Sequence, residues 1–151
     1  MGSPRIKRFH QHHPQAVSRC LVAVCAAGLL AGCNGGTVDK HALKQDSKAI
    51  SSLATEGSLF AEKVAKGEST GPYTRIQADN LGTLAANLAD SLGRRKTSPG
   101  IEPKVRKAGK LAAQVAEQFK ALQDHPSDRA VARSVQQAFG PLADQADKLA
   151  K

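Results

Sequence analysis

The chain has 151 residues, of which 22 are Lys or Arg and 13 are Asp or Glu, giving a formal net charge of +9. This length suits a single domain. Four Phe, one Tyr and no Trp offer too few stacking faces for a platform that binds single-stranded nucleic acid, so we expect no nucleic-acid partner.

The amino-terminal region combines positive charge with a short apolar run. Its first 20 residues carry four cations and no acid, and residues 21–30 follow as an apolar segment. About ten residues are too few to cross a hydrocarbon core that needs roughly 20. A basic region before a short apolar run is typical of a secretory signal. The run closes on Leu-Leu-Ala-Gly-Cys, in which small Ala31 and Gly32 precede Cys33.

These features resemble the signal peptide of bacterial lipoproteins, in which residues 29–33 match the lipobox. The resemblance covers residues 1–33. It implies transfer of diacylglycerol to the Cys33 thiol, cleavage before Cys33 and, often, a third acyl chain on the new amino group. We therefore expect residues 1–32 to be a cleaved signal peptide, residues 33–38 a lipidated tether and residues 39–151 the folded domain.

The resemblance also implies a location and a first partner. The protein would be anchored to the lipid bilayer through acylated Cys33, on the extracytoplasmic face of the outer or plasma membrane of a bacterial cell envelope. Asn34 is not the Asp that this family associates with retention in the inner membrane of Gram-negative bacteria. In a Gram-positive cell, the outer face of the single membrane is implied instead. The domain resembles small alanine-rich lipoproteins of high-GC bacteria in composition only, which transfers no site.

Cleavage would leave Cys33 as the only sulfur nucleophile of the mature chain, because Cys20 and Cys25 lie in the leader. No disulfide framework is then expected. The competing interpretation makes Cys33 an ordinary small residue in an uncleaved anchor. Removal of 32 of the 151 residues leaves 119, and the mature charge falls from +9 to +5 because the four leader cations are lost.

Apolar residues recur every three or four positions in four segments, which indicates amphipathic helices, and no segment alternates like a strand. We expect helices over residues 39–66, 72–92 and 103–123, and a fourth from a Ser127 cap to the carboxy terminus. Gly93 is expected to end the second helix. Gly140-Pro141 is expected to kink or break the fourth near Phe139.

The expected inward-facing positions form one stripe on each helix. They are Leu43, Ile50, Leu53, Gly57, Phe60 and Val64, then Tyr73, Ile76, Leu81, Leu84, Leu88 and Leu92, then Val105, Ala108, Ala112, Val115, Phe119 and Leu122, then Val131, Val135, Ala138, Phe139, Leu142 and Leu149. Gly57 either admits a neighbouring helix or simply weakens its turn. Helices joined by short links pack most simply as antiparallel neighbours, so the expected fold is all-α, an up-down-up-down four-helix bundle after the cleaved signal peptide.

A group of cations flanks the expected link between the second and third helices. We call it the basic cluster, and its members are Arg94, Arg95, Lys96, Lys104, Arg106, Lys107 and Lys110. In an up-down bundle this link lies at the end where the first helix begins, which five residues tie to Cys33 over at most about 18 Å. Cations near anionic headgroups each contribute about 1 kcal/mol. Contact with the membrane surface or another anionic partner is therefore the functional hypothesis, and an ordinary solvated charge run is the alternative.

Charged residues of this region differ in how they affect the fold. Lys104, Arg106 and Lys107 oppose the positive amino-terminal end of the third helix, so local helix stability does not explain them. Asp46 falls on the first helix near the same end, where a structural pair with Arg94 or Arg95 is expected.

No motif in the sequence supports catalysis, metal binding or a cofactor. The mature histidines, His41 and His125, are expected at opposite ends of the bundle, and neither has Glu three residues before it, as a di-iron bundle requires. The only methionine is Met1, which excludes a His/Met haem site. No haem-attachment, phosphate-loop or nucleophile-elbow motif occurs. We expect no enzyme, no metal and no cofactor.

Two function classes remain. One is a non-catalytic interaction module at the cell envelope, with another envelope protein as a candidate partner. The alternative is a carrier that holds a small apolar or anionic ligand in the bundle core. An internal apolar cavity with a polar mouth would favour the carrier, whereas a filled core with an exposed apolar patch would favour the interaction module.

Overall fold

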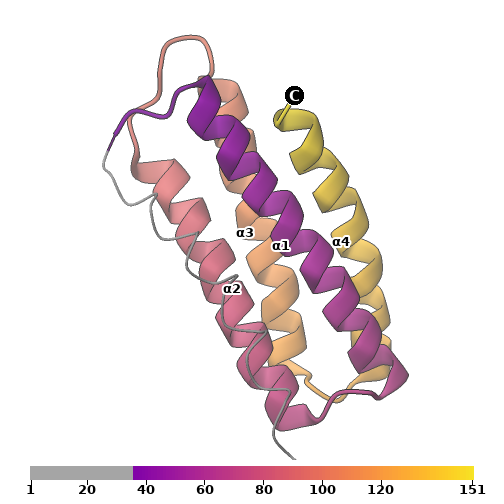
Figure 1. The fold of residues 1–151 in the computed structure, drawn as a ribbon. Helices are drawn as coiled ribbons and strands as arrows, with labels where there is room; N and C mark the ends of the chain where they lie inside the picture. The colour runs from indigo at the N-terminus through magenta and orange to yellow at the C-terminus, as the bar shows by residue number, and fades with distance from the viewer. Residues whose placement is uncertain (1–35) are drawn as a thin grey trace, which may run out of the picture. The chain divides into compact units, whose positions relative to one another are not determined.

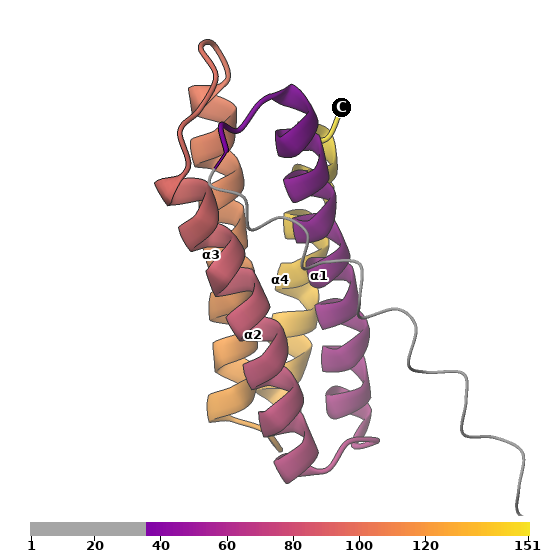
Figure 2. The same ribbon diagram turned by 60° about the vertical axis from the view of Figure 1, so that its left-hand side comes forward.

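The computed structural model describes residues 36–151. They form four helices, α1 (Lys40–Lys66), α2 (Gly71–Arg94), α3 (Glu102–Asp124) and α4 (Arg129–Leu149). Successive helices run in opposite directions (Figures 1 and 2), which confirms the all-α up-down-up-down bundle. α1 packs mainly on α4 and α2 mainly on α3, whereas contact between α1 and α2 is sparse.

Both ends of α1 follow local signals in the sequence. The Asp39 carboxylate accepts a hydrogen bond from the Ala42 N–H at 2.7 Å and caps the first turn. At the other end, Gly67 adopts φ 77°, and the N–H groups of Gly67 and Glu68 donate to carbonyls of the last turn. Glycine is favoured there because it enters the left-handed region without a Cβ clash.

Two predicted helix ends are wrong. α2 does not end at Gly93 but runs through it to Arg94, and Gly93 has no positive φ. Without a left-handed residue at position 93, the helix continues for two residues beyond Leu92. α4 is capped by Asp128 rather than Ser127, because the Asp128 carboxylate accepts from the Ala130 and Val131 N–H groups at 2.8 and 3.1 Å.

Of the predicted kink or break in α4, the break is wrong, because the helix continues through Pro141 from Arg129 to Leu149. Proline removes one helical hydrogen bond and crowds the residue before it. That residue is Gly140, which has no Cβ to clash. Phe139, Leu142 and Ala146 are buried on both sides of the proline, so tertiary packing holds the helix together.

Gly57 lies at the aromatic centre of the core. A Cβ at this position would lie 2.5 Å from Cζ of Phe139 and 2.8 Å from Cζ of Phe119. The two rings are fully buried and their centroids are 4.9 Å apart. Of the two interpretations of Gly57, the structure therefore supports the first: the missing side chain admits rings from α3 and α4.

The predicted stripe of α2 is half wrong. Leu81 and Leu92 are buried as expected, but Tyr73, Ile76 and Leu84 are 58%, 63% and 48% exposed. The buried positions of α2 are Thr74, Ala78, Leu81, Ala85 and Leu92. Small residues bring the α2 backbone close to α3, so the helix turns its alanines inward and leaves the larger side chains at the rim.

Substitution of Gly57 by Ala should destabilise the bundle by about 1–3 kcal/mol, because the new methyl group overpacks against two rings. This loss opposes the gain of up to about 1 kcal/mol that Ala gives in a helix interior. Gly93→Ala is the matched control, since nothing lies within 4 Å of its Cβ position, and it should stabilise. Chemical denaturation of the two variants checks the sign, and equal effects would contradict the close approach.

The pKa of the Asp128 carboxyl is lowered from its ordinary value of 3.8, because the N–H groups of Val131 and Ala130 donate to the ionised form. Because the pKa of this carboxyl is lower in the folded state than in the unfolded state, the ionised carboxylate stabilises the fold above the ordinary pKa. This contribution to stability is lost as the pH falls through the pKa of the folded state. Asp128→Asn should therefore flatten the fall in melting temperature below about pH 4. An unchanged slope in thermal scans against pH would contradict this cap.

Candidate interaction surfaces

The segment that precedes α1 is fixed to the link between α2 and α3. The Val38 N–H donates to the Lys96 carbonyl at 2.7 Å, and the Ser98 N–H donates to the Val38 carbonyl at 2.9 Å. These bonds form a parallel bridge between Val38 and Thr97, and Val38 is fully buried. The segment before α1 and the α2–α3 link thus meet at one end of the bundle, as predicted (Figure 1). Cys33 and the predicted signal peptide lie outside the described residues.

The basic cluster surrounds this bridge. Arg94 and Arg95 lie at the end of α2, and Lys96 supplies a carbonyl to the bridge. The four other cations, Lys104, Arg106, Lys107 and Lys110, lie in the amino-terminal half of α3. Six of the seven side chains are exposed, Arg95 being the exception. Within residues 36–151, no acid lies at ion-pair distance from Lys96 or from the four cations on α3. Their charge is therefore available to an external partner.

Arg95 serves the bundle rather than the exposed cluster. Its guanidinium pairs with Asp46 of α1, and the two side chains are only 14% and 18% exposed. The expected pair between Asp46 and an arginine is thus confirmed for Arg95. Arg94 instead lies 3.5 Å from Asp90 on its own helix, where both groups are exposed. The Arg95 Nε is buried without a hydrogen-bond partner, so this arginine depends on the single carboxylate.

The outer face of α2 carries exposed apolar side chains and almost no charge. Tyr73, Ile76 and Leu84 are exposed, and no ionisable residue occurs between Asp79 and Asp90. Exposed neighbours on this stretch are Asn80, Thr83, Ala86 and Asn87. We call this surface the α2 face. Sequence periodicity missed it, because a search for large apolar residues at helical spacing assigns them to the core.

The sparse contact between α1 and α2 leaves the α2 face beside a thinly packed seam. At the distal end, the Tyr73 ring meets Phe60 of α1 edge-on, with ring centroids 6.3 Å apart. At the opposite end, where α1 begins, Asp46 of α1 pairs with Arg95, which directly follows α2. Ile76 and Leu84 stay exposed between these two contacts. Exposed apolar side chains that form a patch are typical of surfaces that bind other proteins.

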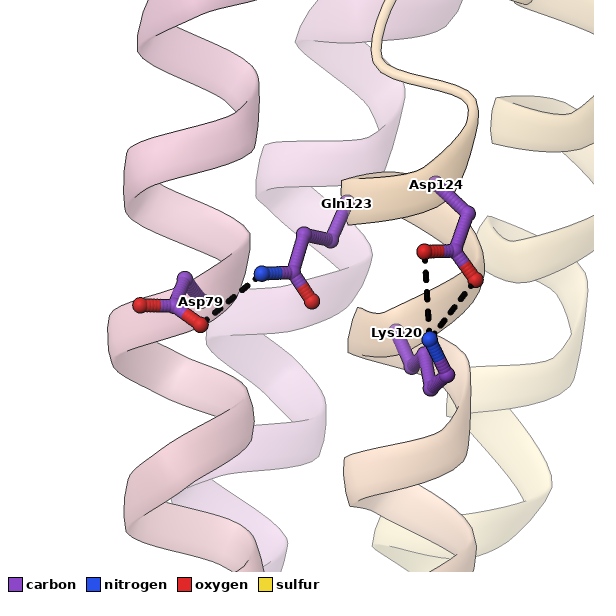
Figure 3. A network of polar contacts seen from close by, with 4 residues as sticks. All are labelled: Asp79, Lys120, Gln123 and Asp124. Atoms are coloured by element: carbon purple, nitrogen blue, oxygen red, sulfur yellow. Dashed lines mark hydrogen bonds and ion pairs between the residues drawn. The ribbon is translucent and has the colours of Figure 1, made fainter.

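A shallow groove of about 270 Å³ lies open on the surface between α2 and α3. Its floor consists of small residues, including Ala78, Gly82 and Ala116, so no deep or enclosed space forms there. Figure 3 shows the polar groups at one end of it: Gln123 donates to Asp79 across the two helices at 2.8 Å, and Lys120 pairs with Asp124 on α3 at 2.9 Å.

Residues 36–151 contain neither a candidate metal cluster nor a candidate membrane span. No group of three or more His, Asp or Glu side chains in residues 36–151 could hold a metal ion. His41 begins α1 and His125 follows α3, so they lie at opposite ends of the bundle, as predicted. None of the four helices is long and apolar enough to cross a membrane.

Comparison of the chain with models of known protein families, with curated proteins and with solved structures gives no match. The surfaces described above therefore carry the functional argument without support from a relative.

Loss of the Asp46 carboxylate should destabilise the bundle by about 1–3 kcal/mol, because it leaves a largely buried guanidinium without a counter-charge. Denaturation of Asp46→Ala, Arg95→Ala and the double variant would measure the coupling between the two groups. The control, Asp90→Ala, removes an exposed pair of the same chemistry and should change stability by less than about 0.5 kcal/mol. Equal effects of the two aspartate substitutions would contradict the special role of Arg95.

Proposed function

We propose that the chain is a lipid-anchored helical module of the bacterial cell envelope that works by binding a partner, without catalysis. The lipobox at residues 29–33 supports the anchor and the extracytoplasmic location. The α2 face supports binding: three large apolar side chains are exposed on a helix whose central ten residues carry no charge.

The exposed apolar surface of α2 is the observation that carries this proposal. In a chain with 23% charged residues, a solvent-facing helix would ordinarily carry ion pairs and long polar side chains. Asn, Thr and Ala beside Leu84 and Ile76 suit contact with another protein, because an uncharged amide or hydroxyl costs less to cover than a charge and can hydrogen-bond to the partner. The partner of this face is an envelope protein with a complementary apolar, uncharged surface.

The alternative is a carrier for a small ligand, and the groove between α2 and α3 is its structural support. Its volume of about 270 Å³ is just below the range of roughly 300–1,000 Å³ that is usual for ligand pockets. The core that was expected to hold the ligand is occupied by the rings of Phe119 and Phe139 beside Gly57. These observations favour the interaction module over the carrier.

The proposal predicts a partner that crosslinks at the α2 face. A photo-reactive residue at Leu84, in the protein as anchored in its native envelope, should capture one reproducible neighbour, whereas the same residue at exposed Gln114 on α3 should not. Ile76→Lys puts a charge on the α2 face and should reduce this crosslink at least about tenfold. The matched control is Ala113→Lys, also at an exposed position, and should leave it unchanged.

Two results would contradict the proposal. A crosslink that survives Ile76→Lys, or that forms equally from Gln114, would remove the α2 face as the binding surface. The anchor is tested separately with Cys33→Ala, which should abolish incorporation of labelled palmitate. Retention of the label would contradict acylation at Cys33.

A further inference from the structure

We propose that the tethered end of the bundle docks on anionic lipid headgroups, so that the helix axes stand steeply on the bilayer and the opposite end points away. This inference rests on the proposed anchor at Cys33 and names the surface that the basic cluster contacts.

The charge of the domain is divided between its two ends. We call residues 36–53, 83–113 and 140–151 the tethered half and residues 54–82 and 114–139 the distal half, each helix being divided near its midpoint. The tethered half holds twelve Lys and Arg against six Asp and Glu, a net charge of +6. The distal half holds six against seven, a net charge of −1. The net positive charge of residues 36–151 thus lies entirely in the tethered half.

Most acids of the tethered half are already engaged within the bundle. Four of the six accept a backbone hydrogen bond or pair with an arginine of the same end. They are Asp39 with the Ala42 N–H, Asp46 with Arg95, Asp90 with Arg94, and Glu102 with the Gly100 N–H. Two of these acids pair with arginines and two accept from backbone N–H groups, and none of the four lies at ion-pair distance from a lysine of this half.

The cations at the start of α3 are unfavourable for the stability of that helix. Ile101 precedes α3 and provides no side-chain cap, and Glu102 is the one acid of the first turn. Lys104, Arg106 and Lys107 follow at once, next to the N–H groups where the helix dipole favours negative charge. A function outside the helix accounts for cations in this position.

The tether limits which surface can reach the bilayer. Val38 is fixed to the α2–α3 link by two backbone hydrogen bonds, and the five steps from Cys33 to Val38 span at most about 18 Å. The 27 residues of α1 make the bundle about 40 Å long, so the distal end lies beyond this reach when the basic end touches the surface. Contact along the whole length would bring the negative distal half against anionic headgroups. Both constraints favour the upright orientation.

Energy transfer from each end of the bundle to the bilayer tests the orientation. The mature acylated chain is reconstituted into vesicles that contain phosphatidylglycerol and an acceptor on the headgroups. With Cys33 acylated, a new cysteine provides one free thiol for the donor dye, either at Pro99→Cys beside the bridge or at Ala130→Cys at the distal end; both positions are exposed. We expect strong transfer from position 99 and weak transfer from position 130. The contrast should fall in high salt and in purely zwitterionic vesicles.

The matched variants reverse three cations at one end or the other. Lys104→Glu, Arg106→Glu and Lys107→Glu together should lower the ratio of docked to undocked protein at least about tenfold. These changes agree with the α3 dipole, so the melting temperature should not fall, which separates lost docking from lost folding. The control, Lys63→Glu with Arg75→Glu and Arg133→Glu, makes the same change in net charge in the distal half and should leave transfer from position 99 unchanged.

Each outcome decides one proposal. Protein that floats with vesicles and shows equal transfer from positions 99 and 130 overturns the docking but keeps the anchor. Protein that carries no acyl chain and fails to float with the vesicles overturns the anchor instead. A contrast that persists unchanged in zwitterionic vesicles overturns the role of lipid charge and leaves another anionic macromolecule as the partner of the basic cluster.

Discussion

The packing of this bundle depends on the contact of α1 with two phenylalanine rings, one from α3 and one from α4. Gly57 makes this contact possible, because any side chain at that position would occupy the space of Phe119 and Phe139. The rings are fully buried, and α3 lies close to both α1 and α4. Three of the four helices are thereby held together at one level of the core. The fourth, α2, is attached mainly through α3, and three of the four large apolar side chains that are exposed in residues 36–151 lie on it.

This asymmetry separates two surfaces that could otherwise interfere. The tethered end gathers the positive charge around the bridge at Val38, whereas the α2 face presents uncharged and apolar groups along the side of the bundle. A surface at an end and a surface along a side point in different directions. An upright bundle on a membrane would therefore keep the α2 face parallel to the membrane normal, where a neighbouring envelope protein can reach it.

Much of the fold could be predicted from the sequence, because the four helices have strong local signals. Asp39, Gly67 and the prolines after the links mark their ends, and apolar periodicity marks their length. Prediction failed where tertiary contacts determine which residues are buried and where a helix continues. The buried stripe of α2 consists partly of alanines, which periodicity ranks below leucine, so Leu84 was assigned to the core although it lies at the rim. Likewise, Pro141 is tolerated because Gly140 precedes it and buried residues flank it.

The candidate surfaces were predictable to different degrees. The basic cluster and its position beside the tether follow from chain order alone, since antiparallel helices bring the second link to the start of the first helix. The sequence could not show that Arg95, unlike the other members of the basic cluster, pairs with Asp46, because only the fold shows which arginine lies beside that carboxylate.

The bridge at Val38 also has a mechanical consequence. It precedes the first turn of α1, and its two hydrogen bonds join the amino-terminal segment to the link between the middle helices. Tension applied through the amino terminus therefore acts on these two bonds before it reaches any helix. Because the link joins α2 to α3, these two helices share a load that would otherwise act on α1 alone.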